Sequence, residues 1–231
     1  MRVRVIVLAK APVPGRVKTR LCPPYTPGSA ARLAAAALHD TIATVGATPV
    51  ADRVLAVDGV HPVPAGWRVQ PQRGAGLGER IADAFARPGI AAAATLLIGM
   101  DTPQVTAAGL MSAIRLLGSS DAVLGPAADG GWWALGLRDP RQAAVLRNIP
   151  TSTASTGART LTALRSRGLL VAELPMLRDV DTAADVAEVA ALCAYGSRFA
   201  AAVATEQVVS AAAALAQEQA AASSLGTAVR P

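Results

Sequence analysis

A cluster of cationic side chains follows the first apolar segment of the chain. Arginine grips phosphate oxygens with two donors at once, and lysine acts as a compact positive charge. The chain contains 20 arginines and two lysines, and both lysines lie between residues 10 and 18. The candidate phosphate-binding residues are Lys10, Gly15, Arg16, Lys18, Thr19 and Arg20. We expect this segment to bind phosphate, and the alternative is an exposed basic loop without a ligand.

A single aspartate follows the apolar run at residues 95–99. Asp101 would lie just beyond the carboxyl end of a buried strand, because Thr102-Pro103 favours an extended exit. A carboxylate at this place suits Mg²⁺ or Mn²⁺, which prefer oxygen ligands and bridge to phosphates. The alternative role is to cap the next helix, although Thr106 is better placed for that.

Two glycine-rich segments could bring a ligand close to the backbone. Gly76, Leu77, Gly78 and Arg80 open a predicted helix, where a base or phosphate can approach. An ordinary turn is the alternative, and the glycine spacing does not fit a dinucleotide-binding fingerprint. The second segment comprises Asp129, Gly130, Gly131 and Trp132. It is either a hairpin turn or a place where a substrate lies against the backbone.

A further acidic segment, residues 178–185, precedes the last predicted helix of the domain. Asp181 or Thr182 can cap that helix, and Asp185 suits its first turn. Asp179 and Asp181 alternate along a strand end, so one of them could join Asp101 around a metal.

The remaining composition narrows the possible chemistry. The chain has two histidines, two distant cysteines and a formal net charge of +6. A zinc cluster, a disulfide framework, a Ser-His-Asp triad and a Walker A loop are therefore not supported. What remains is charge neutralisation, in which lysine, arginine and a metal ion stabilise a diphosphate leaving group.

The elements that must position these residues alternate along the chain. Strands are predicted at 3–9, 53–57, around 69, 95–99, 121–125, 132–137 and 169–174. Helices are predicted at 28–45 with Ser29 as N-cap, 78–87, 106–117, 153–167 and 182–195. This alternation predicts an α/β fold with a mostly parallel sheet. Ligands of such sheets bind beyond the carboxyl ends of the strands.

Length and composition predict one main domain. With 231 residues, 52% of them hydrophobic, the chain is expected to form one domain over residues 1–196. Residues 197–231 are expected to form an alanine-rich helix and a loose tail. We find neither an apolar run long enough to span a membrane nor a signal-peptide cleavage site, and therefore expect a cytoplasmic protein.

Taken together, five segments resemble a known family. They are residues 9–21, 76–80, 98–103, 125–133 and 179–185. Their order and spacing are similar to the bacterial glycosyltransferase-like family of the nucleotide-diphospho-sugar transferase (GT-A) superfamily. That family is similar to molybdenum cofactor guanylyltransferase and 2-phospholactate guanylyltransferase. The resemblance covers residues 1–195 and implies a three-layer α/β/α sandwich that binds a nucleotide along the first half of its sheet.

The resemblance also implies roles for individual residues. The basic segment would bind phosphates, with Lys18 and Asp101 as catalytic residues, and the 76–80 loop would approach the base or ribose. Asp101 would take the place of the metal-binding aspartate, and residues 129–132 would line the acceptor side. Asp101 lacks a partner aspartate two residues away, so the metal would also need Asp129 or Asp181.

These expectations lead to one function and two alternatives. We expect a metal-dependent transferase, most simply a glycosyltransferase that uses a nucleotide-diphospho-sugar and an unknown small-molecule acceptor. The first alternative is a nucleotidyltransferase that joins a nucleoside triphosphate to a phosphorylated metabolite and releases pyrophosphate. The second is a non-enzymatic nucleotide-binding module. Nucleic acid is not an expected partner, because the chain has few aromatic residues for base stacking.

Overall fold

The sheet and its order define the architecture. The computed structural model describes residues 1–87, 94–209, 211 and 212. One seven-stranded sheet has the order β3-β2-β1-β4-β6-β5-β7. The strands are β1 (Val3–Lys10), β2 (Asp52–Asp58), β3 (Trp67–Pro71), β4 (Ala94–Gly99), β5 (Ala122–Pro126), β6 (Trp132–Leu137) and β7 (Val171–Glu173). β6 is antiparallel to its neighbours β4 and β5, and the other neighbouring pairs are parallel.

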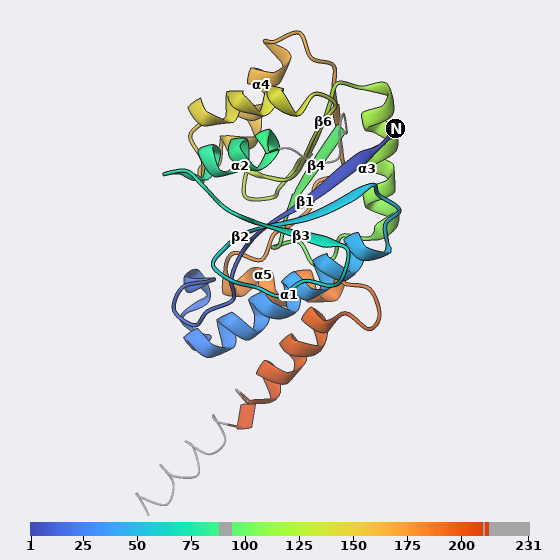
Figure 1. Cartoon of the computed structure of the whole chain (residues 1–231). Helices are drawn as coiled ribbons and strands as arrows, with labels where there is room; N and C mark the ends of the chain where they lie inside the picture. The colour runs from blue at the N-terminus through green and yellow to red at the C-terminus, as the bar shows by residue number, and fades with distance from the viewer. Residues whose placement is uncertain (88–93, 210, 213–231) are drawn as a thin grey trace, which may run out of the picture.

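Helices cover both faces of this sheet (Figure 1). The α-helices are α1 (Pro27–Ala47), α2 (Leu77–Ala86), α3 (Ala107–Ser119), α4 (Thr156–Arg165) and α5 (Ala183–Leu192). Two 3₁₀ helices are η1 (Thr19–Leu21) and η2 (Pro140–Asn148). α1 and α3 pack on one face of the sheet, whereas α2, η2 and α4 pack on the other. The predicted three-layer α/β/α sandwich is confirmed.

The central strand β1 shows why this sequence forms such a sandwich. Val5 and Val7 pack into the core beneath α1 and α3, while Ile6 packs into the core on the opposite face. A parallel strand that is buried on both faces needs a continuous apolar run and no polar alternation. With few aromatic residues, both cores consist mainly of alanine, valine, leucine and isoleucine.

Some element boundaries differ from the sequence prediction for local reasons. The N-cap of α1 is Thr26 and not Ser29, because Thr26 Oγ1 accepts a hydrogen bond of 3.1 Å from the Ser29 amide and Pro27 opens the helix. Thr106 caps α3 as predicted, through the Gly109 amide. The helix α4 begins at Thr156, so residues 151–155 remain outside it and are available to the site.

A helix at residues 198–209 packs against the domain. Phe199 is fully buried and shares a cluster with Leu21 and Val180, which adjoin the basic and acidic segments of the sequence. The Asp40 carboxylate of α1 accepts hydrogen bonds from the amides of residues 198 and 199 and from the Ser197 hydroxyl. The helix therefore supports two loops of the site. Residues 213–231, where we expected a loose tail, lie outside the described residues.

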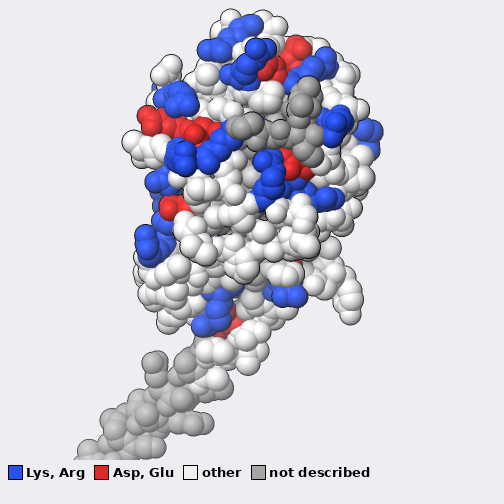
Figure 2. All heavy atoms as spheres, in the orientation of Figure 1, with Lys and Arg blue, Asp and Glu red and all other residues white. Residues whose placement is uncertain are grey.

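Among the described residues, we find no helix with both the length and the apolar character that a membrane span requires. On the face shown in Figure 2, lysines and arginines lie in separate groups, several of them beside acidic residues. This face offers the alternating charges of an ordinary solvated surface.

We predict that Phe199→Ala destabilises the domain by about 3 kcal/mol, because it leaves a cavity between the C-terminal helix and α1. Val208→Ala is the matched control on the same helix, since Val208 is 69% exposed. Urea unfolding measures both variants. Equal and small effects for the two would mean that this helix does not support the domain in solution.

Candidate functional site

The predicted site residues meet at one edge of the sheet. The parallel strands β1, β2, β3 and β4 end there, and the antiparallel strand β6 begins there. Two adjoining clefts open at this edge, with volumes of about 450 and 570 Å³. They share lining residues, including Arg20, Asp101 and Asp181. The clefts are therefore two halves of one site.

The smaller half, which we call the cationic cleft, holds the basic segment. Its lining includes Lys10, Arg16, Lys18, Thr19, Arg20, Leu77 and Arg80. The larger half, which we call the acidic cleft, is lined on its polar side by Asp101, Asp129, Asp179, Asp181, Asp185 and Arg178. Segments far apart in the sequence thus bring opposite charges to one place.

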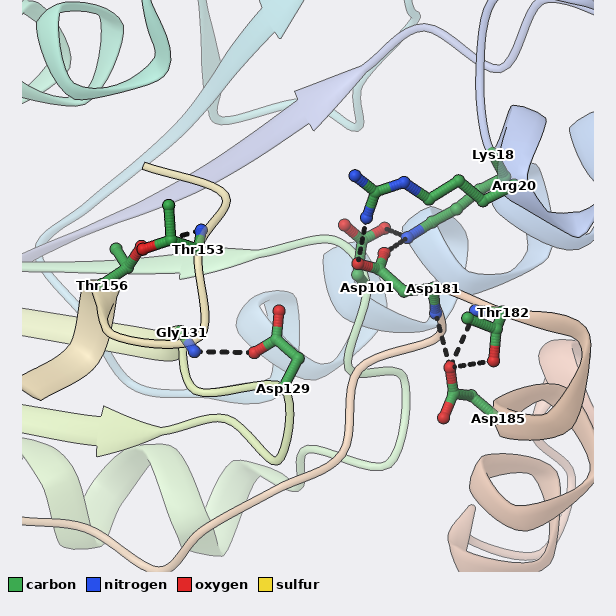
Figure 3. A network of polar contacts seen from close by, with 10 residues as sticks. All are labelled: Lys18, Arg20, Asp101, Asp129, Gly131, Thr153, Thr156, Asp181, Thr182 and Asp185. Atoms are coloured by element: carbon green, nitrogen blue, oxygen red, sulfur yellow. Dashed lines mark hydrogen bonds and ion pairs between the residues drawn. The ribbon is translucent and has the colours of Figure 1, made fainter. Parts of the chain in front are cut away.

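Lys18 joins the two clefts. Its ammonium lies 2.9 Å from a carboxylate oxygen of Asp101 and 2.9 Å from one of Asp181 (Figure 3). Arg20 approaches the second oxygen of Asp181 at 3.6 Å. The Lys18 side chain is 11% exposed, and this burial lowers its pKa, but the two carboxylates outweigh burial and raise the pKa above its ordinary value. Lys18 is therefore charged at neutral pH.

The local backbone fixes Lys18 and the acidic segment. Lys18 adopts a left-handed conformation with φ 47°, and Leu21 anchors the following turn in the core. The Val180 amide donates to the Asp101 carbonyl at 2.9 Å, and Gln104 Nε2 donates to the Arg178 carbonyl at 2.6 Å. These bonds tie residues 178–181 to the loop after β4, so the carboxylates are held at fixed spacing.

Backbone strain is concentrated at this site. Among the described residues, two that are not glycine have a positive φ, namely Lys18 and Ser152 (φ 60°). Ser152 lines both clefts, and Lys18 lines the cationic cleft. Such conformations cost on the order of 1 kcal/mol each and persist where the surroundings hold them. Their position is consistent with a functional site.

Three carboxylates form a possible metal centre. Asp129, Asp179 and Asp181 each offer an oxygen, and these atoms lie within 4.8 Å of one another. Burial and the neighbouring Asp129 and Asp181 carboxylates raise the pKa of Asp179 to about 6. The Asp129 carboxylate also accepts a 2.7 Å hydrogen bond from the Gly131 amide (Figure 3). Oxygen donors of this kind fit Mg²⁺ or Mn²⁺.

This group differs in one member from the set that the sequence favoured. The sequence left open whether Asp179 or Asp181 would join the metal site, and the structure places both in the group. Asp101 is not in this group, although it shares the Lys18 ammonium with Asp181, and its role as a metal ligand stays a prediction. Asp185 and Thr182 form the capping box of α5, which leaves Asp181 available to the site.

The glycines have mainly structural positions. Gly15, Gly76, Gly78 and Gly130 are not among the residues that line the two clefts in the described part of the chain. A side chain at Gly78 would collide with the Leu146 carbonyl, and one at Gly130 (φ 87°) with the Ala154 carbonyl. These two glycines let η2 and the turn before α4 pack closely.

The acceptor-side residues also divide into two groups. Asp129, Gly131 and Trp132 line the acidic cleft. Trp133, the next residue along β6, is buried and donates to the Pro175 carbonyl. This alternation places only the first tryptophan at the cleft, as expected for a strand.

Sequence reasoning missed two residues of the cationic cleft. Asp58 is the last residue of β2 and forms an ion pair of 2.9 Å with Arg80. Gln72 follows β3, and its amide donates to the carbonyls of Ala9 and Ala56. Neither belongs to a recognisable motif, but each stands directly at a strand end, which is the signal that could have found them.

The family comparison identifies a bacterial group. Residues 30–153 match the model of the family described as "Uncharacterized protein conserved in bacteria (DUF2064)". The chain belongs to the DUF2064 family. No curated protein matches its sequence significantly.

Solved structures place this DUF2064 protein in a larger fold group. A protein of Desulfovibrio desulfuricans G20, assigned provisionally as a nucleotide-diphospho-sugar transferase, is 27% identical with a TM-score of 0.71, over 79% of this chain and 84% of its own. The manganese complex of Rv0371c from Mycobacterium tuberculosis H37Rv is 21% identical with a TM-score of 0.53, over 82% and 97%. A CMP:2-keto-3-deoxy-manno-octonic acid synthetase in complex with CTP is 12% identical with a TM-score of 0.53, over 83% and 98%. The GT-A-like fold is confirmed.

We predict that Asp179→Asn stabilises the metal-free DUF2064 protein at pH 8, because it removes one of three crowded negative charges. The folded state raises the pKa of this carboxyl to about 6, so the penalty is present above that pH and disappears as the pH falls towards 4. After discounting for solvent screening, we expect a gain on the order of 1 kcal/mol at pH 8 and none at pH 4.

Urea unfolding in the presence of a chelator measures this gain. Asp139→Asn is the contrasting control, because the hydrogen bond from Arg141 lowers the pKa of Asp139 and loss of that charge should not stabilise the protein. Mn²⁺ should then raise the melting temperature of the wild type more than that of Asp179→Asn. A destabilised Asp179→Asn variant at pH 8 would show that the three charges do not repel one another as described.

Proposed function

We propose that this protein is a metal-dependent transferase that uses a nucleotide-activated donor, most simply a nucleotide-diphospho-sugar. The observation that carries the proposal is the meeting of a cationic and an acidic cleft at Lys18. The 27% identical protein assigned as a nucleotide-diphospho-sugar transferase supports the same class.

The donor diphosphate would lie in the cationic cleft. Lys10, Arg16, Lys18, Arg20 and Arg80 line it, and Asp58, Asp101 and Asp181 balance part of that charge. Guanidinium and ammonium groups held in place before the reaction cost little reorganisation when charge develops on a departing phosphate. These residues would therefore bind the donor and stabilise the leaving diphosphate.

The acidic group would hold the metal ion. Asp129, Asp179 and Asp181 provide crowded carboxylates whose repulsion a divalent cation would relieve. When bound, Mg²⁺ or Mn²⁺ neutralises phosphate charge. A structural neighbour with this fold was solved with manganese. Mn²⁺ is therefore the first ion to test.

The transfer step can be written with the groups of the two clefts. The oxygen of an acceptor hydroxyl forms a bond to the anomeric carbon as the bond from that carbon to the phosphate oxygen breaks. The nucleoside diphosphate leaves with the electron pair and is held by Lys18 and its neighbouring arginines. The hydroxyl proton passes to a carboxylate of the acidic cleft.

Nucleotidyl transfer is the second candidate, and one observation favours it. Four cations, Lys10, Arg16, Lys18 and Arg20, stand in the eleven residues that start with the last residue of β1, which would also suit a triphosphate. A phosphate oxygen of the acceptor would attack the α-phosphorus and release pyrophosphate. The CMP:2-keto-3-deoxy-manno-octonic acid synthetase, which is similar in fold, was solved with the nucleoside triphosphate CTP.

The experiment incubates the protein with Mn²⁺ and a panel of nucleoside triphosphates and nucleotide-diphospho-sugars, each with a mixture of small hydroxylated and phosphorylated acceptors. Chromatography separates nucleoside diphosphate, which glycosyl transfer releases, from pyrophosphate, which nucleotidyl transfer releases. Isothermal titration of the same panel measures binding. Binding without either product would favour a nucleotide-binding module, and absence of binding would overturn the proposal.

Lys18→Met and Arg115→Ala are the matched variants for this assay. Lys18→Met removes the ammonium and keeps an apolar stem, whereas Arg115→Ala removes a cation from the surface of α3. We expect Lys18→Met to weaken nucleotide binding by about tenfold, which corresponds to about 1.4 kcal/mol. Arg115→Ala should leave it unchanged.

A further inference from the structure

The acidic cleft has a charge imbalance that bears on the second substrate. Its charged lining comprises Asp101, Asp129, Asp179, Asp181, Asp185, Arg20 and Arg178. Five carboxylates thus face two guanidinium groups and the Lys18 ammonium, which pairs with Asp101 and Asp181. The cleft is therefore negative without an ion, and a single divalent ion would bring its formal charge to zero and not to a positive value. An anionic acceptor entering here would meet repulsion in the ion-free cleft and no excess of positive charge in the ion-bound one.

Both guanidinium groups of this cleft are already engaged. Arg178 pairs with Asp185 at 3.0 Å and with Glu188 at 2.9 Å, and Arg20 approaches Asp181 at 3.6 Å. Among the described residues that line the acidic cleft, each cation therefore has a carboxylate partner. Because Arg20 serves the donor in the proposed function, a phosphate group on the acceptor would be left with Arg178 and would have to displace its two carboxylate partners.

The same cleft also has apolar lining residues. Leu8, Leu77, Ile81, Leu97 and Trp132 line it, and Leu77 is 40% exposed although it is a large apolar residue. Ser152 and Thr153 stand at the cleft with hydroxyl groups. Pockets with an apolar wall and a few polar groups favour ligands with an apolar face and hydrogen-bonding edges.

We propose that the acidic cleft selects an uncharged, hydroxyl-bearing acceptor with an apolar face, such as a sugar ring or an alcohol, and excludes phosphorylated acceptors. This inference rests on the proposed function, because only a transferase has an acceptor. The exclusion of anions depends only on the charges of the cleft. Within that function it favours glycosyl transfer to a hydroxyl over nucleotidyl transfer to a phosphate.

Collisional quenching of Trp132 fluorescence tests the exclusion without donor or metal. Trp67→Phe leaves Trp132 as the accessible tryptophan, since Trp133 is buried, and Trp67→Phe/Trp132→Phe provides the blank. Quenching by neutral acrylamide, anionic iodide and cationic caesium is measured at constant ionic strength, each relative to free N-acetyltryptophanamide. We expect the relative quenching constant for iodide to be about threefold below that for acrylamide. The relative quenching constant for caesium should exceed that for iodide.

Charge variants made in the Trp67→Phe background sharpen this measurement. Asp129→Asn should raise iodide quenching, whereas Asp139→Asn, which changes a carboxylate outside the clefts, should not. A relative iodide value equal to or above that of acrylamide would overturn the proposal. Because no donor is present, that failure is separate from a failure of the donor assay.

A matched pair of probes tests the class of acceptor. 4-Nitrophenyl glucoside joins an uncharged sugar to an aromatic ring, and 4-nitrophenyl phosphate carries the same ring on an anion. We expect the glucoside to quench Trp132 more strongly in the Trp67→Phe protein. Equal quenching, or stronger quenching by the phosphate, would contradict the proposal.

Discussion

The arrangement of the site depends on one ion triplet, in which the buried Lys18 ammonium lies between the partly exposed carboxylates of Asp101 and Asp181. These residues come from the loops after β1, after β4 and before α5. Without the ammonium, two carboxylates would face each other with less compensation. With it, the cationic cleft and the acidic cleft share a wall, and a diphosphate in one can lie close to an ion in the other.

The rest of the fold can be understood as support for this triplet. The parallel strands bring the loops to one edge, and β6 runs against them so that its first residues reach the same edge. Leu21 and Val180, which adjoin the triplet, pack against Phe199 of the C-terminal helix. The hydrogen bond from Gln104 to the Arg178 carbonyl fixes the acidic segment from the other side. Apolar packing and hydrogen bonds to the backbone thus fix the segments that carry the charged side chains.

The sequence predicted the parts of this site that depend on local patterns. Asp101 stands two residues after β4 and Lys18 lies in the loop after β1, so the rule that ligands bind beyond the strand ends was enough to connect them. The fold class followed from the alternation of strands and helices. The sequence left Asp179 and Asp181 as alternatives. That both lie beside Asp129 did not follow, because those distances depend on how β6 and the 178–181 segment pack in three dimensions.

Other features could not be predicted for similar reasons. Asp58 and Gln72 belong to no recognisable motif. They reach the cationic cleft only because β2 lies beside β1 in the sheet and β3 lies beside β2. The docking of Phe199 requires knowledge of the cluster formed by α1 and α5. Thr26 replaced Ser29 as the N-cap because Pro27 can start a helix, a preference that competes with hydroxyl capping one turn later.

The most direct measurement is a crystal structure of the protein with Mn²⁺ and a nucleoside diphosphate, with the ion located by its anomalous scattering. The account predicts the ion at the carboxylates of Asp129, Asp179 and Asp181, and the diphosphate against Lys18 and the loop after β1. An ion and a diphosphate bound in separate places, or a diphosphate away from Lys18, would contradict it.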